Sequence, residues 1–221
     1  MIRVIAILSI ALAVALGGYY FLAPQGGTAG SDLLIGSANA EEAGDIDTST
    51  VIEMQIGNPD APVTMIEYAS YTCSHCANFH NGPFKKIKAN YIDTGKINFI
   101  YREVYFDKYG LWASMIARCG GPEKFFGITD LIYKGQRDWS TAGDPASIVA
   151  GLRKIALLAG VESDTLDACL QDGDTARTLV TWFQENAEAD GINATPTFII
   201  NGEKVENQPY EGLADIIESK M

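Results

Sequence analysis

VTMIEYASYTCSHCANF, residues 63–79, is the stretch that decides the fold of this chain. Residues 63–69 are almost all apolar, as expected of a central strand that is buried on both faces of a sheet. Cys73 and Cys76 follow, separated by Ser74 and His75, and residues 77–90 have a helical pattern. The stretch therefore predicts a strand, a loop and a helix with two cysteines at its start.

The spacing of these cysteines suits thiol–disulfide exchange. Two intervening residues place both sulfurs in the first turn of one helix, where a disulfide closes with little rearrangement. Unpaired N–H groups and the positive end of the helix dipole favour a thiolate on Cys73, and a protonated His75 would add positive charge. Because a stabilised thiolate makes the disulfide more oxidising, we predict that Cys73 is the reactive sulfur.

The alternative for this motif is half of a zinc or copper site. A structural zinc site usually needs a second close pair of ligands, whereas Cys119 and Cys169 stand alone and the only histidines are His75 and His80. His80 follows Cys76 by four residues on the same helical face, and we expect it to be a surface or packing residue. We favour redox chemistry, which needs no metal or organic cofactor.

The composition sets broad limits. The chain has 221 residues, which is enough for one medium-sized domain or a domain with an insertion. Its formal net charge of −12 argues against nucleic-acid binding, which demands clustered Lys and Arg.

Residues 1–23 predict a targeting element. Arg3 precedes the uncharged run Val4 to Ala23, which suits either a cleaved signal peptide or a membrane anchor, and both alternatives stay open. Residues 24–50, rich in Gly, Ala, Ser and Thr, predict a flexible linker. We expect the rest of the chain to be exported to the periplasm, and to be held at the inner membrane if the segment is not cleaved.

Export bears on the remaining cysteines, because disulfides persist in oxidising compartments. Four cysteines allow two bridges, and Cys73–Cys76 accounts for one. We predict that Cys119 and Cys169, which both lie in helix-like segments, form a second, structural disulfide. Two buried free thiols are the alternative.

The order of elements predicts an α/β fold. Thr195-Pro196 leads into an apolar strand, and Asn201-Gly202 is a strong hairpin signal after it. This order, with Pro83 kinking the first helix, is that of a thioredoxin-like fold with a helical domain inserted between the βαβ half and the C-terminal ββα half. We expect residues 51–105 and 191–221 to form the thioredoxin-like domain and residues 106–190 the inserted helical domain.

The individual strands and helices can also be placed. Strands are predicted over 51–55, 63–69, 97–104, 197–200 and 203–206, and helices over 77–90, 111–118, 145–158, 175–190 and 210–221. Pro122 should open a further helix, and a short helix around Cys169 should be capped by Ser163 or Asp164.

From about Gly57 to its C-terminus, the chain resembles the DsbA family of exported dithiol oxidases, in the branch that includes the Bacillus protein BdbD. The resemblance rests on the lead-in Gly57-Asn58-Pro59-Asp60-Ala61-Pro62, on Cys73-Ser74-His75-Cys76, on Trp112 at the start of the helical block, and on Thr195-Pro196 before Phe198-Ile199-Ile200-Asn201-Gly202.

By matching position, the resemblance implies roles for five residues. Cys73 would be the nucleophile, Cys76 the buried resolving cysteine, and His75 the motif histidine that stabilises the thiolate. Pro196 matches the family's cis-proline, and Thr195 before it would lie against the disulfide and pair with the substrate backbone.

Glu67 matches a further family position, six residues before the first cysteine. A carboxylate in an otherwise apolar central strand is costly unless it is used. We predict that Glu67 lies beneath the motif and exchanges protons with Cys76. The alternative is a glutamate at a strand end that reaches solvent.

The predicted function is that of a periplasmic thiol–disulfide oxidoreductase that introduces disulfide bonds into exported proteins. The resemblance implies unfolded or reduced exported proteins as substrates and a DsbB-like membrane quinone oxidoreductase as the oxidant of the site, and we expect a monomer. Ser74 and Thr195 stand where the best-known oxidases have proline and valine, so a reductase or isomerase using the same site is one alternative. A copper-binding chaperone using Cys73, Cys76 and His80 is the alternative from a different class.

Overall fold

The computed structural model describes residues 46–221. The predicted targeting element and residues 24–45 of the predicted linker lie outside the described residues. Within residues 46–221, no helix is long and apolar enough to cross a membrane. The last part of the predicted linker includes a short 3-10 turn, Thr48–Thr50, whose Thr48 hydroxyl donates to Glu185.

A five-stranded sheet forms the centre of the fold, in the order β1-β3-β2-β4-β5. The central strand β2 pairs in parallel with β3 and antiparallel with β4, while β1 and β5 are antiparallel edge strands. The predicted bounds of three strands, 63–69, 197–200 and 203–206, are confirmed. Each of these strands follows a sharp turn signal in the sequence. The strands are β1 (Met54–Gly57), β2 (Val63–Ala69), β3 (Ile97–Glu103), β4 (Thr197–Ile200) and β5 (Glu203–Glu206).

The first strand begins later than predicted. We expected a strand over 51–55, but β1 starts at Met54, opposite Tyr101. The carbonyl of Ile52 accepts a hydrogen bond from the Arg118 side chain at 2.9 Å instead of one from a neighbouring strand. A side chain distant in sequence therefore holds this segment outside the ladder.

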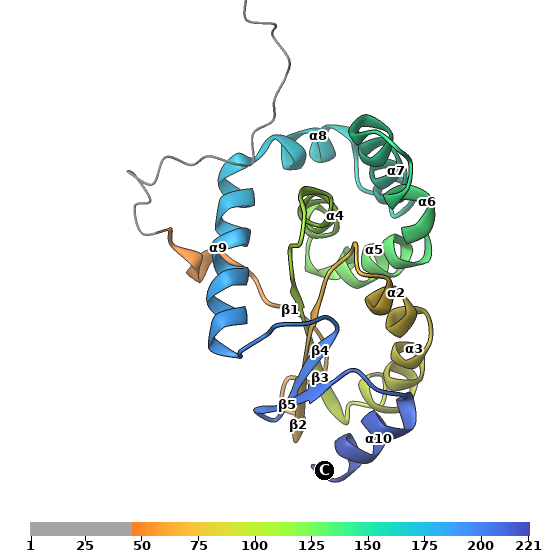
Figure 1. Cartoon of the computed structure of the whole chain (residues 1–221), viewed down its shortest axis with the longest axis vertical. Helices are drawn as coiled ribbons and strands as arrows, with labels where there is room; N and C mark the ends of the chain where they lie inside the picture. Colours follow the sequence, from red (N-terminus) through yellow and green to blue (C-terminus); the bar gives the residue numbers. More distant parts are fainter. Residues whose placement is uncertain (1–45) are drawn as a thin grey trace, which may run out of the picture. The chain divides into compact units, whose positions relative to one another are not determined.

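Strand β2 presents alternate residues to two different layers, as the pleat requires. Glu67 lies on the face that is covered by α2 (Ser74–Asn81), α3 (Pro83–Ile87) and α10 (Tyr210–Glu218) (Figure 1). Tyr68 lies on the other face, where it hydrogen-bonds to α9 (Gly173–Ala189) and to Asp190 just beyond that helix. The two cysteines of the motif thus belong to the layer that covers one face of the sheet.

The predicted kink in the first helix is a complete break. Helix α2 ends at Asn81, Gly82 adopts φ −128° and ψ −93°, and Pro83 begins α3. Proline has no N–H to continue the first helix and suits the first turn of the second. A π-helical turn, Lys88–Ile92, follows α3.

Six helices separate β3 from β4. Asp107 and Asp144 cap two of them with side-chain bonds to backbone N–H groups, as such residues commonly do. The predicted cap of the Cys169 helix was wrong, because Glu162 occupies the cap position and makes no side-chain bond there. The helices are α4 (Lys108–Cys119), α5 (Pro122–Lys134), α6 (Gln136–Ser140), which the sequence did not predict, α7 (Pro145–Leu158), α8 (Ser163–Gln171) and α9.

A disulfide between Cys119 and Cys169 joins the end of α4 to α8. The two Cα atoms are 6.0 Å apart, within the usual range for a bridge, and 50 residues separate them in the sequence. The bridge therefore ties together two helices of the segment between β3 and β4.

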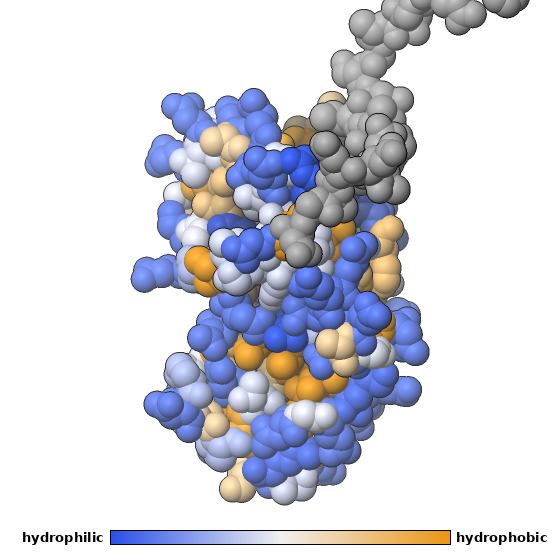
Figure 2. All heavy atoms as spheres, turned by 90° about the vertical axis from the view of Figure 1, so that its left-hand side faces the viewer, coloured by the Kyte–Doolittle hydropathy of each residue, from blue (hydrophilic) through white to orange (hydrophobic). Residues whose placement is uncertain are grey.

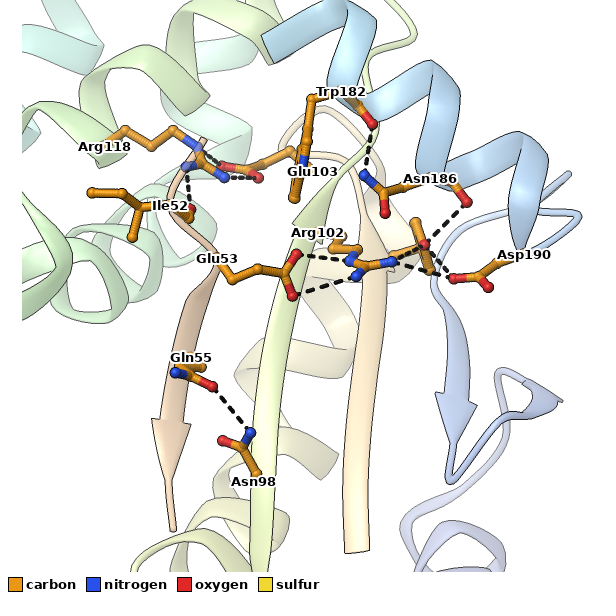
Figure 3. A network of polar contacts seen from close by, with 11 residues as sticks. Ile52, Glu53, Gln55, Asn98, Arg102, Glu103, Arg118, Trp182, Asn186 and Asp190 are labelled. Carbon is orange, nitrogen blue, oxygen red and sulfur yellow. Dashed lines mark hydrogen bonds and ion pairs between the residues drawn. The ribbon is translucent and has the colours of Figure 1, made fainter. Parts of the chain in front are cut away.

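Helix α9 is attached to the sheet through a polar network (Figure 3). Arg102 donates to Glu53 at 2.9 Å and lies 3.4 Å from Asp190, at the end of α9. The guanidinium groups of Arg102 and Arg118 lie 5.8 and 5.5 Å from the ring centre of Trp182, a favourable cation–π geometry. The network fixes α9 across the carboxyl end of β3.

Further along the same face, α9 leaves the sheet less covered. Ile100, Ile66 and Ile199 stand opposite one another on three neighbouring strands, and the first two are only half-buried. Figure 2 shows this side of the molecule, with apolar residues gathered below its centre.

Candidate active site

Cys73 is the N-cap residue of α2, at the carboxyl end of strand β2. Its φ of −81° and ψ of 120° are extended, and its carbonyl accepts the first helical hydrogen bond, from Ala77 N–H at 3.1 Å. Its side chain therefore stands where the first N–H groups of the helix have no helical partners.

The two cysteine sulfurs occupy unlike environments. Both thiols are free, but Cys73 is partly exposed and Cys76 is completely buried. An incoming thiol can reach only the first. The motif thus has one accessible and one shielded sulfur.

Cys73 is strongly acidic. A hydrogen bond from the Cys76 thiol, with further donors at Thr195 and at the N–H groups of Cys76 and His75, lowers the pKa of Cys73 to about 5 despite its partial burial. Burial, followed by the bond to Cys73 and the charge of Glu67, raises the pKa of Cys76 far above its ordinary value. At neutral pH, Cys73 is the thiolate and Cys76 is the thiol.

The Thr195–Pro196 peptide bond is cis and lies next to the reactive sulfur. The carbonyl of Thr195 is 3.5 Å from the Cys73 sulfur. The Thr195 hydroxyl is buried, and apart from the two cysteine sulfurs it has no hydrogen-bond partner within residues 46–221. The two motifs that lie far apart in the sequence thus meet at one point of the structure.

Glu67 is completely buried beside α2. Its Oε2 is 2.8 Å from Nε2 of His80, while its Oε1 has no partner within the described part of the chain. Burial raises the pKa of Glu67, and the charge and hydrogen bond of His80 oppose that rise. The alternative of a strand-end glutamate that reaches solvent is wrong, and His80 is a buried packing residue.

The His75 side chain is exposed to solvent. Its backbone N–H is among the groups that lower the pKa of Cys73. The part of His75 that acts on the sulfur in this structure is therefore the main chain.

Two helices between β3 and β4 brace the loop that carries Cys73. Gln136, at the start of α6, donates through Nε2 to the carbonyls of Tyr71 at 2.8 Å and Cys73 at 2.9 Å. The Tyr133 hydroxyl, on α5, donates to the carbonyl of Ser70 at 3.2 Å. Neither residue was predicted from the sequence: Gln136 lies in a short helix with no clear pattern of its own, and nothing near Tyr133 in the sequence points to the Cys73 loop.

Within the described residues, the three ligands of the copper alternative are not grouped around a common point. Cys73, Cys76 and His80 were its proposed ligands, but Nε2 of His80 is taken by Glu67. Among residues 46–221, no three His, Cys, Asp or Glu side chains are grouped so that they could hold a metal ion.

Comparison with known proteins gives consistent results. A family model described as thioredoxin matches residues 49–219. A Rickettsia bellii protein with the provisional name protein-disulfide oxidoreductase is 34% identical over 170 residues, which are 76% of this chain and 64% of the relative. The chain thus spans somewhat less than two thirds of that relative's length.

Two solved structures also match the fold of this chain. The crystal structure of Wolbachia pipientis alpha-DsbA1 matches with a TM-score of 0.70 and 31% identity, over 76% of this chain and 89% of that one. Oxidised BdbD from Bacillus subtilis matches with a TM-score of 0.66 and 26% identity, over 76% and 92% of the two chains.

Proposed function

Because the chain belongs to the DsbA-like group of the thioredoxin family, we propose that it introduces disulfide bonds into exported proteins by thiol–disulfide exchange. The observation that carries the proposal is the asymmetry of the two sulfurs. An acidic, accessible Cys73 beside a buried Cys76 thiol suits a site whose reduced form is stabilised. Stabilising the reduced form makes the disulfide a stronger oxidant.

The exchange has two steps. A substrate thiolate attacks the Cys73 sulfur of the oxidised site, the Cys73–Cys76 bond breaks, and Cys76 leaves as a thiolate that takes up a proton. A second substrate thiolate then attacks the substrate sulfur of this mixed disulfide. The substrate disulfide forms, Cys73 leaves as a thiolate, and two electrons have passed from the substrate to the site.

The accessible sulfur would be assisted by three residues, which place the substrate or stabilise the thiolate: Thr195, Pro196 and His75. The Thr195 carbonyl and the cis peptide bond lie against Cys73, where a substrate backbone has to pass. The N–H of His75 stabilises the Cys73 thiolate as the leaving group of the second step.

Glu67 would exchange the proton of the buried sulfur, Cys76. Cys76 has to gain a proton when it leaves and lose it when the site is reoxidised, and it is shielded from water. Oε1 of Glu67, which has no hydrogen-bond partner within the described residues, is a buried acceptor on the face of the sheet that α2 covers, and the charge of Glu67 acts on Cys76. Glu67 therefore exchanges the Cys76 proton.

The periplasm is the compartment we propose, with unfolded or reduced exported proteins as substrates. The uncharged run at residues 4–23 and a structural disulfide both suit an exported protein. Reoxidation of Cys73 and Cys76 by a DsbB-like membrane quinone oxidoreductase would complete the cycle.

A disulfide reductase or isomerase is the second candidate, and one observation favours it. Thr195 presents a buried hydroxyl beside the reactive sulfur, where the best-known oxidases have valine. A hydroxyl at this place can donate to a sulfur of a bound substrate as well as to Cys73, and so can hold a mixed disulfide in the site, which suits a protein that reduces or rearranges disulfides.

The test is the oxidative refolding of a reduced, denatured protein that contains disulfides in its native state. We expect the oxidised full chain to transfer disulfides to it stoichiometrically, as counted by mass after alkylation, and the Cys73→Ser variant to transfer none. Reduction of insulin by the dithiol form without disulfide transfer would favour the second candidate. No exchange with either substrate would contradict both.

A further inference from the structure

A buried ionisable pair lies under the active-site helix, and one of its members has no role in the steps above. Glu67 on β2 has an exposed fraction of 0% and His80 on α2 one of 2%. Nε2 of His80 and Oε2 of Glu67 are 2.8 Å apart, a hydrogen-bond distance. Burying two such groups is costly, and this pair lies next to the turn of α2 that carries Cys76.

Aromatic rings fix the position of the His80 imidazole. It stacks on Tyr133 with ring centres 4.3 Å apart, lies 4.6 Å from Phe84, and meets Phe79 edge to face at 5.6 Å. Such packing holds the ring in one orientation, with Nε2 aimed at the carboxylate. The faces of aromatic rings also favour a positively charged partner.

The other titratable groups around Glu67 are acids. Cys73 and Cys76 approach from α2, Tyr101 from β3 and Tyr133 from α5. Burial raises the pKa of both tyrosines well above the ordinary value, so they remain neutral.

His80 is the one base in this group within the described residues. Burial, as the largest cause, and the Cys73 thiolate raise the pKa of Glu67, while His80 lowers it. Without His80, nothing in the described part of the chain would counter the cost of ionising the carboxyl.

We propose that His80 is a positioning residue for the Cys76 reaction: it donates from Nε2 to Oε2 of Glu67, stabilises the ionised form of that carboxyl group, and leaves Oε1 to exchange the Cys76 proton. The inference rests on the proposed thiol–disulfide exchange. It assigns a role to a residue outside the redox motif.

The step that depends on this pair is the closing of a mixed disulfide on Cys73. The Cys76 S–H bond breaks and its proton passes to Oε1 of Glu67. The Cys76 sulfur bonds to Cys73, and the other sulfur of the mixed disulfide leaves as a thiolate. Cys73 and Cys76 are thereby oxidised, and the disulfide that supplied the leaving sulfur is reduced.

The test follows this step with oxidised glutathione. The reduced full chain is mixed with it at a series of pH values, quenched in acid, and separated by mass into reduced, glutathionylated and closed forms. His80→Gln keeps an amide N–H near the position of Nε2 but removes the imidazole, and with it any positive charge that faces Glu67. We expect closing to be slower at pH 7 in this variant, by at most about tenfold for each pH unit by which the midpoint of the closing rate moves up. Formation of the mixed disulfide on Cys73 should stay within about twofold and serves as the internal control.

Glu67→Gln supplies the matched comparison. It should slow closing and abolish the pH midpoint, and adding His80→Gln to it should cause no further slowing, because both act through one group. A purely structural role for His80 would lower the melting temperature without moving the midpoint. An unmoved midpoint, or an equal slowing in the Glu67→Gln background, would overturn the proposal.

A measurement on the unaltered chain does not depend on the folding of a variant. The chain has only two histidines, so nitrogen NMR of the ¹⁵N-histidine-labelled protein resolves His80 from His75. We expect Nε2 of His80 to carry a proton in the reduced protein at all pH values at which closing occurs. An unprotonated Nε2 would overturn the proposal. A chain that forms no mixed disulfide would instead contradict the proposed function.

Discussion

Removing the Cys76 thiol should make Cys73 less acidic. The hydrogen bond from Cys76 is the largest of the causes that lower the pKa of Cys73 to about 5. A hydrogen bond to a charged group contributes about 1.5 to 3 kcal/mol, and one pKa unit corresponds to about 1.4 kcal/mol. Cys76→Ala should therefore raise the pKa of Cys73 by about one to two units.

The assay is a pH titration of the thiolate absorbance of the reduced protein, together with the rate of alkylation of Cys73. Cys76→Ser is the matched control, because its hydroxyl keeps a donor at the same place. We expect the serine variant to titrate near the unaltered protein and the alanine variant to titrate clearly higher. Equal midpoints for the alanine and serine variants would refute the reasoning, since the donor would then contribute nothing.

Three further predictions concern stability. Because the folded state lowers the pKa of Cys73 from 9.0 to about 5, the reduced protein should gain stability over the oxidised one in denaturant melts as pH rises from about 5 to about 9, and above pH 9 the raised pKa of the buried Cys76 should take stability away again. Glu103→Gln should lower the free energy of unfolding in urea by about 3 to 5 kcal/mol, because it leaves the buried Arg118 guanidinium without its ionic partner. Asp174→Asn, at an exposed ion pair, should lower it by less than about 0.5 kcal/mol. Similar losses for the two variants would contradict this prediction. The double variant Cys119→Ala, Cys169→Ala should lose about 4 kcal/mol for a bridge that spans 50 residues, while disulfide exchange at Cys73 is kept; an unchanged melting temperature would count against a stabilising bridge.

Local signals in the sequence predicted much of the fold. Strand β2 is an almost continuous apolar run, and Asn201-Gly202 adopts positive φ values of 48° and 83° at the hairpin, as its turn type requires. Asp144 caps its helix with Pro145 in the first turn. Each of these features depends on residues that are neighbours in the sequence.

Contacts between distant segments were harder to predict. The start of β1 depends on Arg118, which takes the Ile52 carbonyl. The brace on the Cys73 loop depends on Gln136, and no local pattern relates a glutamine in a five-residue helix to a loop far before it. These contacts exist only after the helices between β3 and β4 have packed.

The site itself was predicted unevenly. Cys73 and Cys76 follow from their spacing, and the position of Glu67 within an apolar strand indicated that it was unusual. The partner of Glu67 did not follow, because the helical spacing of His80 gave no sign of which layer it faces. The structure supplied that information by placing both side chains between β2 and α2.

The redox potential of the full chain decides whether its Cys73–Cys76 disulfide is a strong oxidant. The protein is equilibrated in glutathione buffers of stepped composition, and its alkylated cysteines are counted by mass. We predict that Cys73 and Cys76 are largely reduced even in mildly oxidising buffer, while Cys119 and Cys169 remain bridged. A Cys73–Cys76 disulfide that persists until the buffer is strongly reducing would contradict it.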